Sequence, residues 1–156
     1  MFWKKKTGGN IVSPCVGQVI KLEDVPDPVF SEKILGDGVA VLPENGAFCS
    51  PVDGKIVQVF DTKHAYSLRS DDGLDILVHI GLNTVELKGK GFKSLVNDGD
   101  LVKKGDALCE VNLELITDMG YQLYTPILIT NMSEVKKIEV NEKKVEQKEP
   151  LFTYEK

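Results

Sequence analysis

The chain contains two histidines, His64 and His79, and both lie in the stretch TKHAYSLRSDDGLDILVHIG at residues 62–81. The segments on either side of SDDG alternate apolar and polar residues like strands, and Ser, Asp and Gly are typical turn residues, so a β-hairpin is predicted. If its loop has an even number of residues, as we expect, His64 lies directly opposite His79, with Cβ atoms about 4.5 to 5.5 Å apart. An odd loop would shift the register by one residue and place the rings on opposite faces.

Two close imidazoles can carry out nucleophilic catalysis without a metal or cofactor, because one neutral ring can attack phosphorus while the other donates a hydrogen bond to its oxygens. Zinc hydrolysis would need a third ligand from a distant loop, since Asp75, on the same strand face as His79, is about 13 Å away along the strand. A serine triad is not indicated, because the chain has no Gly-x-Ser-x-Gly motif. Packing without function remains the alternative for either histidine taken singly.

Length and composition indicate one globular domain with one core. The chain has 156 residues, and its net charge of −5 argues against general binding to nucleic acid or acidic lipid. No apolar run approaches the ~20 residues of a membrane span, and the basic start is followed by no signal-peptide core, so we expect a cytoplasmic protein. Cys15, Cys49 and Cys109 are odd in number and widely spaced, which predicts buried thiols rather than disulfides or a metal site.

Short apolar segments with a period of two residues dominate the chain and predict an all-β sandwich or barrel. Helical signal is limited to short turns within residues 27–35 and 112–120. The highly charged end, residues 134–156, also carries apolar residues, which favours edge strands that close the barrel over a disordered tail. The predicted strands lie within residues 17–25, 36–42, 54–60, 64–70, 74–81, 106–113 and 126–131.

An internal repeat supports this architecture. SPCVGQVI at residues 13–20 and SPVDGKIV at residues 50–57 share a turn, a glycine and the start of a strand. A third phrase, NDGDLVKKGDALCEV at residues 97–111, resembles biotin and lipoyl carrier domains. Those domains present a lysine for modification, and residues 110–125 contain none. We therefore interpret this likeness as one of barrel architecture and not of attachment chemistry.

Four longer phrases make a more specific match. They are SPVDGKIVQVFDTKHAYSL, LDILVHIGLNTVELKGKGF, VNDGDLVKKGDAL and TPILITN, which together extend over most of residues 11–131. With these phrases the chain resembles the glucose-type IIA component of the bacterial phosphoenolpyruvate-dependent sugar phosphotransferase system. The resemblance implies an antiparallel β-sandwich, here a single IIA domain at residues 11–156 after a flexible N-terminus at residues 1–10.

The resemblance also implies roles for individual residues. His79, in the Val-His-Ile-Gly phrase, is the phosphorylated nucleophile, and His64 assists without being phosphorylated. Thr62 supplies a hydroxyl to the same hydrogen-bonded group. No cofactor or metal is implied. For attack, one nitrogen of His79 must hold its proton toward a fixed acceptor, and we expect a backbone carbonyl made available by Gly81 to be that acceptor.

The implied activity is that of a phosphotransferase component. A histidine-containing phosphocarrier protein donates phosphate to His79, and a cysteine of a IIB domain in a IIB/IIC membrane sugar permease accepts it. Neither the sugar nor the oligomeric state follows from the sequence. The alternative is a regulator that binds transporters or kinases according to its phosphorylation state, with both histidines as possible zinc ligands at the interface.

Partner proteins must reach His79, so an apolar rim is expected around it. Phe30, Phe60 and Val85 are the candidates, with ordinary core packing as the alternative. One position departs from the family pattern: Asn83 stands where an aspartate is usual. Asparagine keeps hydrogen bonding but loses the charge that could pair with a basic group on the carrier, so carrier affinity is the property most open to change.

Overall fold

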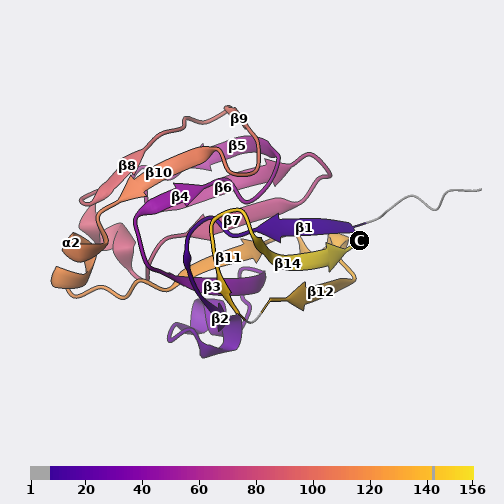
Figure 1. Ribbon diagram of the computed structural model, residues 1–156, viewed down its shortest axis with the longest axis horizontal. Coiled ribbons are helices and arrows are strands. Elements are labelled where there is room, and N and C mark those ends of the chain that lie inside the picture. The colour runs from indigo at the N-terminus through magenta and orange to yellow at the C-terminus, as the bar shows by residue number, and fades with distance from the viewer. Residues whose placement is uncertain (1–7, 142) are drawn as a thin grey trace, which may run out of the picture.

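The computed structural model describes residues 8–141 and 143–156, which form antiparallel sheets joined by short helical turns (Figure 1). The largest sheet has the strand order β13 (Lys144–Val145), β2 (Gly17–Lys21), β3 (Asp37–Pro43), β11 (Thr125–Ile129), β7 (Asp75–His79), β6 (Ala65–Ser70), β5 (Gly54–Val59) and β9 (Leu101–Val102). The two smaller sheets are β1 (Gly8–Val12), β14 (Pro150–Glu155) and β12 (Lys137–Val140), and β4 (Ala47–Cys49), β10 (Ala107–Val111) and β8 (Phe92–Ser94). The all-β prediction is confirmed.

The helical elements are short. The helices α1 (Pro28–Ser31) and α2 (Leu113–Asp118) fall inside the two predicted segments. Asp27 and Asn112 begin them, because each side chain accepts a hydrogen bond from a backbone N–H of the first turn. The 3₁₀ turns are η1 (Leu22–Asp24), η2 (Thr84–Leu87) and η3 (Met132–Glu134). Among the described residues, no helix is long and apolar enough to cross a membrane.

Both faces of β7 are covered, and this makes the strand a rigid support. Ile76, Val78 and the following Ile80 are almost fully buried in the main core, which the three sheets enclose. On the opposite face, Leu77 packs against a second cluster that includes Phe30 of α1 and Leu82. The three cysteines are free and buried, as predicted, and burial raises the pKa of each thiol.

The first described strand, β1, begins at Gly8, three residues before the boundary that we placed at Ile11. Residues 8–10 belong to β1 and pair with β14, whereas residues 1–7 lie outside the described part of the chain. The absence of a side chain at Gly9 serves packing, because a Cβ there would lie 2.8 Å from the Tyr154 hydroxyl. At the other end, β12 and β13 are edge strands as expected, but β14 lies between β1 and β12.

The internal repeat has a structural basis. In each copy a buried serine hydroxyl donates to the carbonyl of the second residue after it, at 2.6 Å from Ser13 to Cys15 and at 2.7 Å from Ser50 to Val52. The same arrangement recurs at Ser94 with a distance of 2.8 Å. The sequence did not reveal this third copy, because Ser94 is followed by Leu95 and not by proline.

The β6–β7 hairpin has an odd loop, so our predicted register is wrong by one residue. Its loop is Asp71, Asp72 and Gly73, closed by a 2.8 Å bond from the Ser70 N–H to the Leu74 carbonyl. Gly73 adopts φ +91°, which supplies the left-handed residue that an odd loop of this type requires. The residue opposite His79 is therefore Ala65 and not His64.

Candidate active site at the open end of the hairpin

The two histidine rings meet in spite of the shifted register. Their centroids are 4.9 Å apart and the ring planes are nearly perpendicular, at 87°. The reason is that His64 precedes β6 and follows Lys63, whose φ is +59°, so strand alternation does not set the direction of its ring. A 2.8 Å bond from the Ile80 N–H to the His64 carbonyl keeps the two segments adjacent. The expectation that an odd loop separates the rings is therefore also wrong.

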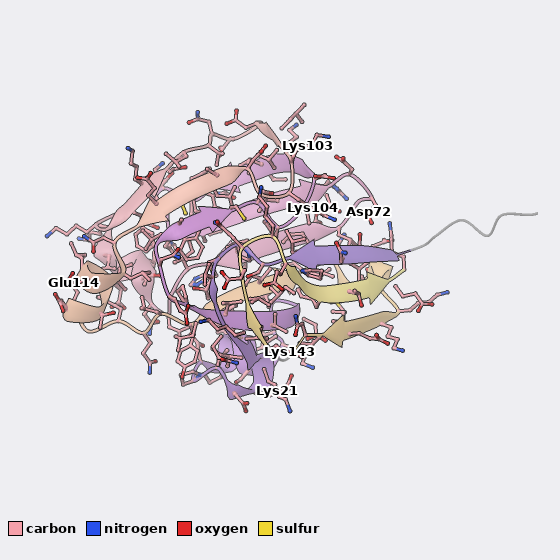
Figure 2. All side chains as sticks on the ribbon, in the orientation of Figure 1. Lys21, Asp72, Lys103, Lys104, Glu114 and Lys143 are labelled. Atoms are coloured by element: carbon pink, nitrogen blue, oxygen red, sulfur yellow. The ribbon has the colours of Figure 1, made fainter. Side chains whose placement is uncertain are left out.

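The site lies at the end of the molecule near α2. Figure 2 shows Asp72, in the hairpin loop, at the end opposite Glu114 of α2. The two strands run from the Asp72 loop toward the α2 end, where β7 finishes at His79. Beyond that point the Leu82 N–H donates to the Gln122 carbonyl at 3.0 Å, which joins the segment after His79 to the segment after α2.

His79 is held as a neutral ring with one defined tautomer. Its Nδ1 lies 2.8 Å from the Gly81 carbonyl oxygen, and because a carbonyl only accepts, Nδ1 must carry the proton. The lone pair is then on Nε2. Burial lowers the pKa of His79, although the bond to Gly81 and the charge of Asp27 oppose this change. The expected backbone acceptor at Gly81 is therefore present.

His64 is the more deeply buried of the two rings, at 4% exposed. Burial and then the neighbouring His79 lower its pKa to about 4, so it is neutral at pH 7. Its Nδ1 lies 2.6 Å from the Thr62 hydroxyl. The structure thus brings all three predicted site residues into one hydrogen-bonded and packed group.

The three rim candidates differ in position. The Phe30 ring lies 5.0 Å from the His79 ring, but it is buried and belongs to the second core cluster. Phe60 is partly exposed, and its ring meets His64 edge-on at 5.8 Å. Val85, in η2, is 51% exposed. Phe30 therefore also serves the core, whereas Phe60 and Val85 are accessible.

The segment after His79 is built from unusual backbone conformations. Gly81 has φ +78° and Asn83 has φ +58°. Asparagine tolerates the left-handed region better than most residues, so Asn83 suits its position sterically, and its side chain is exposed. Within residues 8–141 and 143–156, no three His, Cys, Asp or Glu side chains gather as a metal-binding group.

Sequence reasoning missed two residues of this region. Asp27 begins α1 and lies close enough to His79 to raise its pKa, and Thr84 donates a 2.5 Å hydrogen bond to the Ile80 carbonyl. The Asp27–Pro28 pair at the start of α1 is typical of a helix start but gives no sign of the helix's position over β7. Thr84 lies within the phrase that carries the family resemblance, but its spacing from His79 gives no sign of a contact.

Comparisons with known proteins identify the family of the chain. Residues 9–135 match the family model of the phosphoenolpyruvate-dependent sugar phosphotransferase system, EIIA 1. The chain belongs to this family. It is 45% identical over 133 residues to the glucose-specific EIIA component of the phosphotransferase system of Staphylococcus epidermidis, covering 85% of this chain and 80% of that protein. The corresponding protein of Oceanobacillus iheyensis is 48% identical over 136 residues, with 85% and 82% covered.

A solved structure extends the likeness to the whole fold. Glucose permease IIA from Mycoplasma capricolum superposes with a TM-score of 0.91 and 37% sequence identity, covering 97% of this EIIA chain and 99% of that one. The β-sandwich prediction and the family prediction are thereby confirmed. Membership gives the chain a phosphoryl-relay role in the sugar phosphotransferase system.

Replacing Gly81 tests whether this backbone is needed. In Gly81→Ala, the new Cβ would lie 2.6 Å from the Thr84 Cγ2 and 3.1 Å from the Gln122 carbonyl oxygen, at a positive φ. We expect unfolding, measured by chemical denaturation, to require about 1 to 3 kcal/mol less free energy. Gly73→Ala, which has open space and a positive φ of +91°, is the control for backbone strain alone. Equal decreases in the free energy of unfolding of both variants would contradict steric crowding of a side chain at position 81.

The histidine pKa values predict a pH dependence. NMR titration should place the midpoint of His64 near pH 4 and that of His79 below 6.5. Because the unfolded rings bind protons near pH 6.5 and the folded His64 does so only near 4, the free energy of unfolding falls as pH decreases from about 6.5 to about 4. Carboxylates titrate in the same range, so a His64→Gln/His79→Gln double variant isolates the contribution of the rings. A His64 midpoint near 6.5 would contradict the buried neutral pair.

Proposed function

We propose that His79 is the phosphoryl carrier of this protein and that its Nε2 is the atom that carries the group. The observation that carries the proposal is the bond from Nδ1 of His79 to the Gly81 carbonyl, which leaves the Nε2 lone pair free for attack. In the first step Nε2 attacks the phosphorus on the phosphohistidine of a carrier protein. A new N–P bond forms on His79 as the carrier's N–P bond breaks, and the carrier's ring nitrogen takes back its electron pair.

The second step returns His79 to its starting state. A cysteine thiolate on a IIB domain attacks the phosphorus, the N–P bond breaks, and Nε2 recovers its lone pair. Neither step moves the Nδ1 proton, so the Gly81 carbonyl can hold the ring in one orientation throughout. Phosphoryl transfer depends largely on positioning and on stabilisation of the oxygens, and a fixed ring supplies the first of these.

His64 and Thr62 supply the stabilisation of the phosphoryl oxygens. A neutral His64 has one ring proton, and if the Thr62 hydroxyl donates to Nδ1, that proton is on Nε2. His64 Nε2–H then donates to an oxygen of the phosphoryl group on the adjacent His79. Because both rings are neutral, they do not repel each other before phosphate arrives. Burial keeps them so, since it lowers both pKa values.

Membership of the family supports a proposal for the partners and the cell compartment. We propose a histidine phosphocarrier protein as the donor and the IIB part of a IIB/IIC sugar permease as the acceptor, with the chain working in the cytoplasm. The names of the relatives point to a permease of the glucose class. Phe60, whose ring meets His64, and the exposed Val85 of η2 offer apolar surface for either partner. We also propose that β1 (Gly8–Val12) and the residues after it, up to residue 156, form one functional domain.

Substitution of each histidine separates the two steps. The phosphoryl donor is phosphoenolpyruvate with the general transfer enzyme and the carrier, and the label is mapped after digestion. We expect His79→Gln to accept no phosphate. His64→Gln should accept phosphate but pass it to IIB-containing membranes about 10²- to 10³-fold more slowly, because a hydrogen bond to the transferring oxygens is lost.

The matched control is Lys55→Gln, an exposed change on β5 near the Asp72 end of the molecule, which should leave both steps unchanged. Labelling of His64 in the wild type would overturn the assignment of the carrier residue. Onward transfer at the full rate by His64→Gln would overturn the assisting role. Labelled protein that never yields phosphorylated sugar with permease membranes would favour the regulatory alternative over the relay.

A further inference from the structure

The backbone that follows His79 is anchored at successive peptide groups. The peptide group between His79 and Ile80 donates its N–H to the His64 carbonyl at 2.8 Å. The group between Ile80 and Gly81 accepts, at 2.5 Å, from the Thr84 hydroxyl. The group between Gly81 and Leu82 donates its N–H to the Gln122 carbonyl at 3.0 Å, and its own carbonyl accepts from His79 Nδ1. The middle group is anchored by the Thr84 side chain, whereas the His64 and Gln122 partners of the flanking groups are backbone carbonyls.

Thr84 is fully buried and can adopt few alternative positions. It is the first residue of η2, and the N–H of Glu86 closes this turn by donating to the Asn83 carbonyl at 3.1 Å. The Thr84 methyl group fills the space that a side chain on Gly81 would occupy, with its Cγ2 2.6 Å from the ideal Cβ position. The hydroxyl and the methyl group therefore act on adjacent residues, Ile80 and Gly81.

We propose that Thr84 is a positioning residue for the phosphoryl-transfer reaction: its hydroxyl fixes the Ile80–Gly81 peptide so that the Gly81 carbonyl faces His79 Nδ1. This inference rests on the proposed role of His79 as the phosphoryl carrier. Thr84 acts through the backbone, and a contact between Thr84 and the phosphoryl group is no part of the proposal.

The chemical consequence concerns the tautomer of His79. Gly81 has no side chain and adopts φ +78°. Rotation of the Ile80–Gly81 peptide group is therefore restrained mainly by hydrogen bonds. Loss of the Thr84 hydroxyl leaves the buried Ile80 carbonyl without this donor, which favours rotation of that peptide toward another partner. Because Gly81 joins this peptide to the next one, the Gly81 carbonyl then shifts away from Nδ1, against the single remaining backbone bond from the Leu82 N–H to Gln122. A ring without this acceptor also populates the tautomer with the proton on Nε2, which has no lone pair there for attack.

The direct test is the tautomer of His79 in the unphosphorylated protein, read by NMR of ring-15N-labelled histidine at pH 7.5. The wild type should show the Nδ1–H form. Thr84→Val keeps the size of the side chain and removes the hydroxyl, and it should show a mixture of both forms. Thr84→Ser keeps the hydroxyl and removes the methyl group, and it should restore the Nδ1–H form. The signals of His64 serve as an internal reference.

Ser50→Ala is the matched control. It removes another buried hydroxyl that donates to a backbone carbonyl, and the Ser50 carbonyl accepts from Gly105, next to Lys104 at the Asp72 end of the molecule (Figure 2). Ser50→Ala should lower stability without changing the tautomer of His79. A general loss of stability in Thr84→Val is thereby distinguished from a local loss of positioning.

The rate of phosphate acceptance from the carrier gives the second measurement. It should fall about 10- to 100-fold in Thr84→Val and recover in Thr84→Ser. A wild-type tautomer in Thr84→Val would overturn the positioning role, and so would loss of the Nδ1–H form in Thr84→Ser, which remains informative even if the valine variant does not fold. If wild-type His79 accepts no phosphate, the proposed function fails, while the tautomer measurement still decides what Thr84 does to the ring.

Discussion

The hydrogen bond between His79 Nδ1 and the Gly81 carbonyl is the constraint on which the rest of the site depends. It selects one of the two tautomers of the imidazole, the one with the proton on Nδ1 and the lone pair on Nε2. The bond requires that the chain turn back immediately after β7, and a glycine at φ +78° permits that turn. The sheet supplies the rigidity, since β7 is packed on both faces by separate clusters of buried residues.

Burial and chemistry act in the same direction at this site. A ring that is to attack phosphorus must be neutral, and taking two imidazoles out of water lowers the pKa of both. The neighbouring His79 lowers the pKa of His64 further, because two charged rings would repel each other. Asp27 limits the shift at His79. The protein thus obtains two neutral rings from packing against Phe30 and Phe60 and needs no further charged group to hold them.

The sequence predicted the class of fold and the residues that meet at the site. It did not predict the features that depend on local backbone conformation. Period-two patterning identified the strands because most of them bury only one face. The phrases around the histidines identified the family. The register of the hairpin was wrong because Gly73 allows an odd loop. The rings still meet because Lys63, in the left-handed region, releases His64 from strand alternation, and no pattern in the sequence encodes this. Thr84 escaped prediction for a similar reason: its partner is a carbonyl group, which every residue has.

The most direct measurement of the central claim is the position of phosphorus on the ring of the phosphorylated wild-type protein. Ring-15N-labelled protein, phosphorylated by its carrier, would be studied by NMR for coupling between nitrogen and phosphorus. We predict phosphorus on Nε2 of His79, with Nδ1 still protonated and bonded to the Gly81 carbonyl. Phosphorus on Nδ1 of His79, or on either nitrogen of His64, would contradict it.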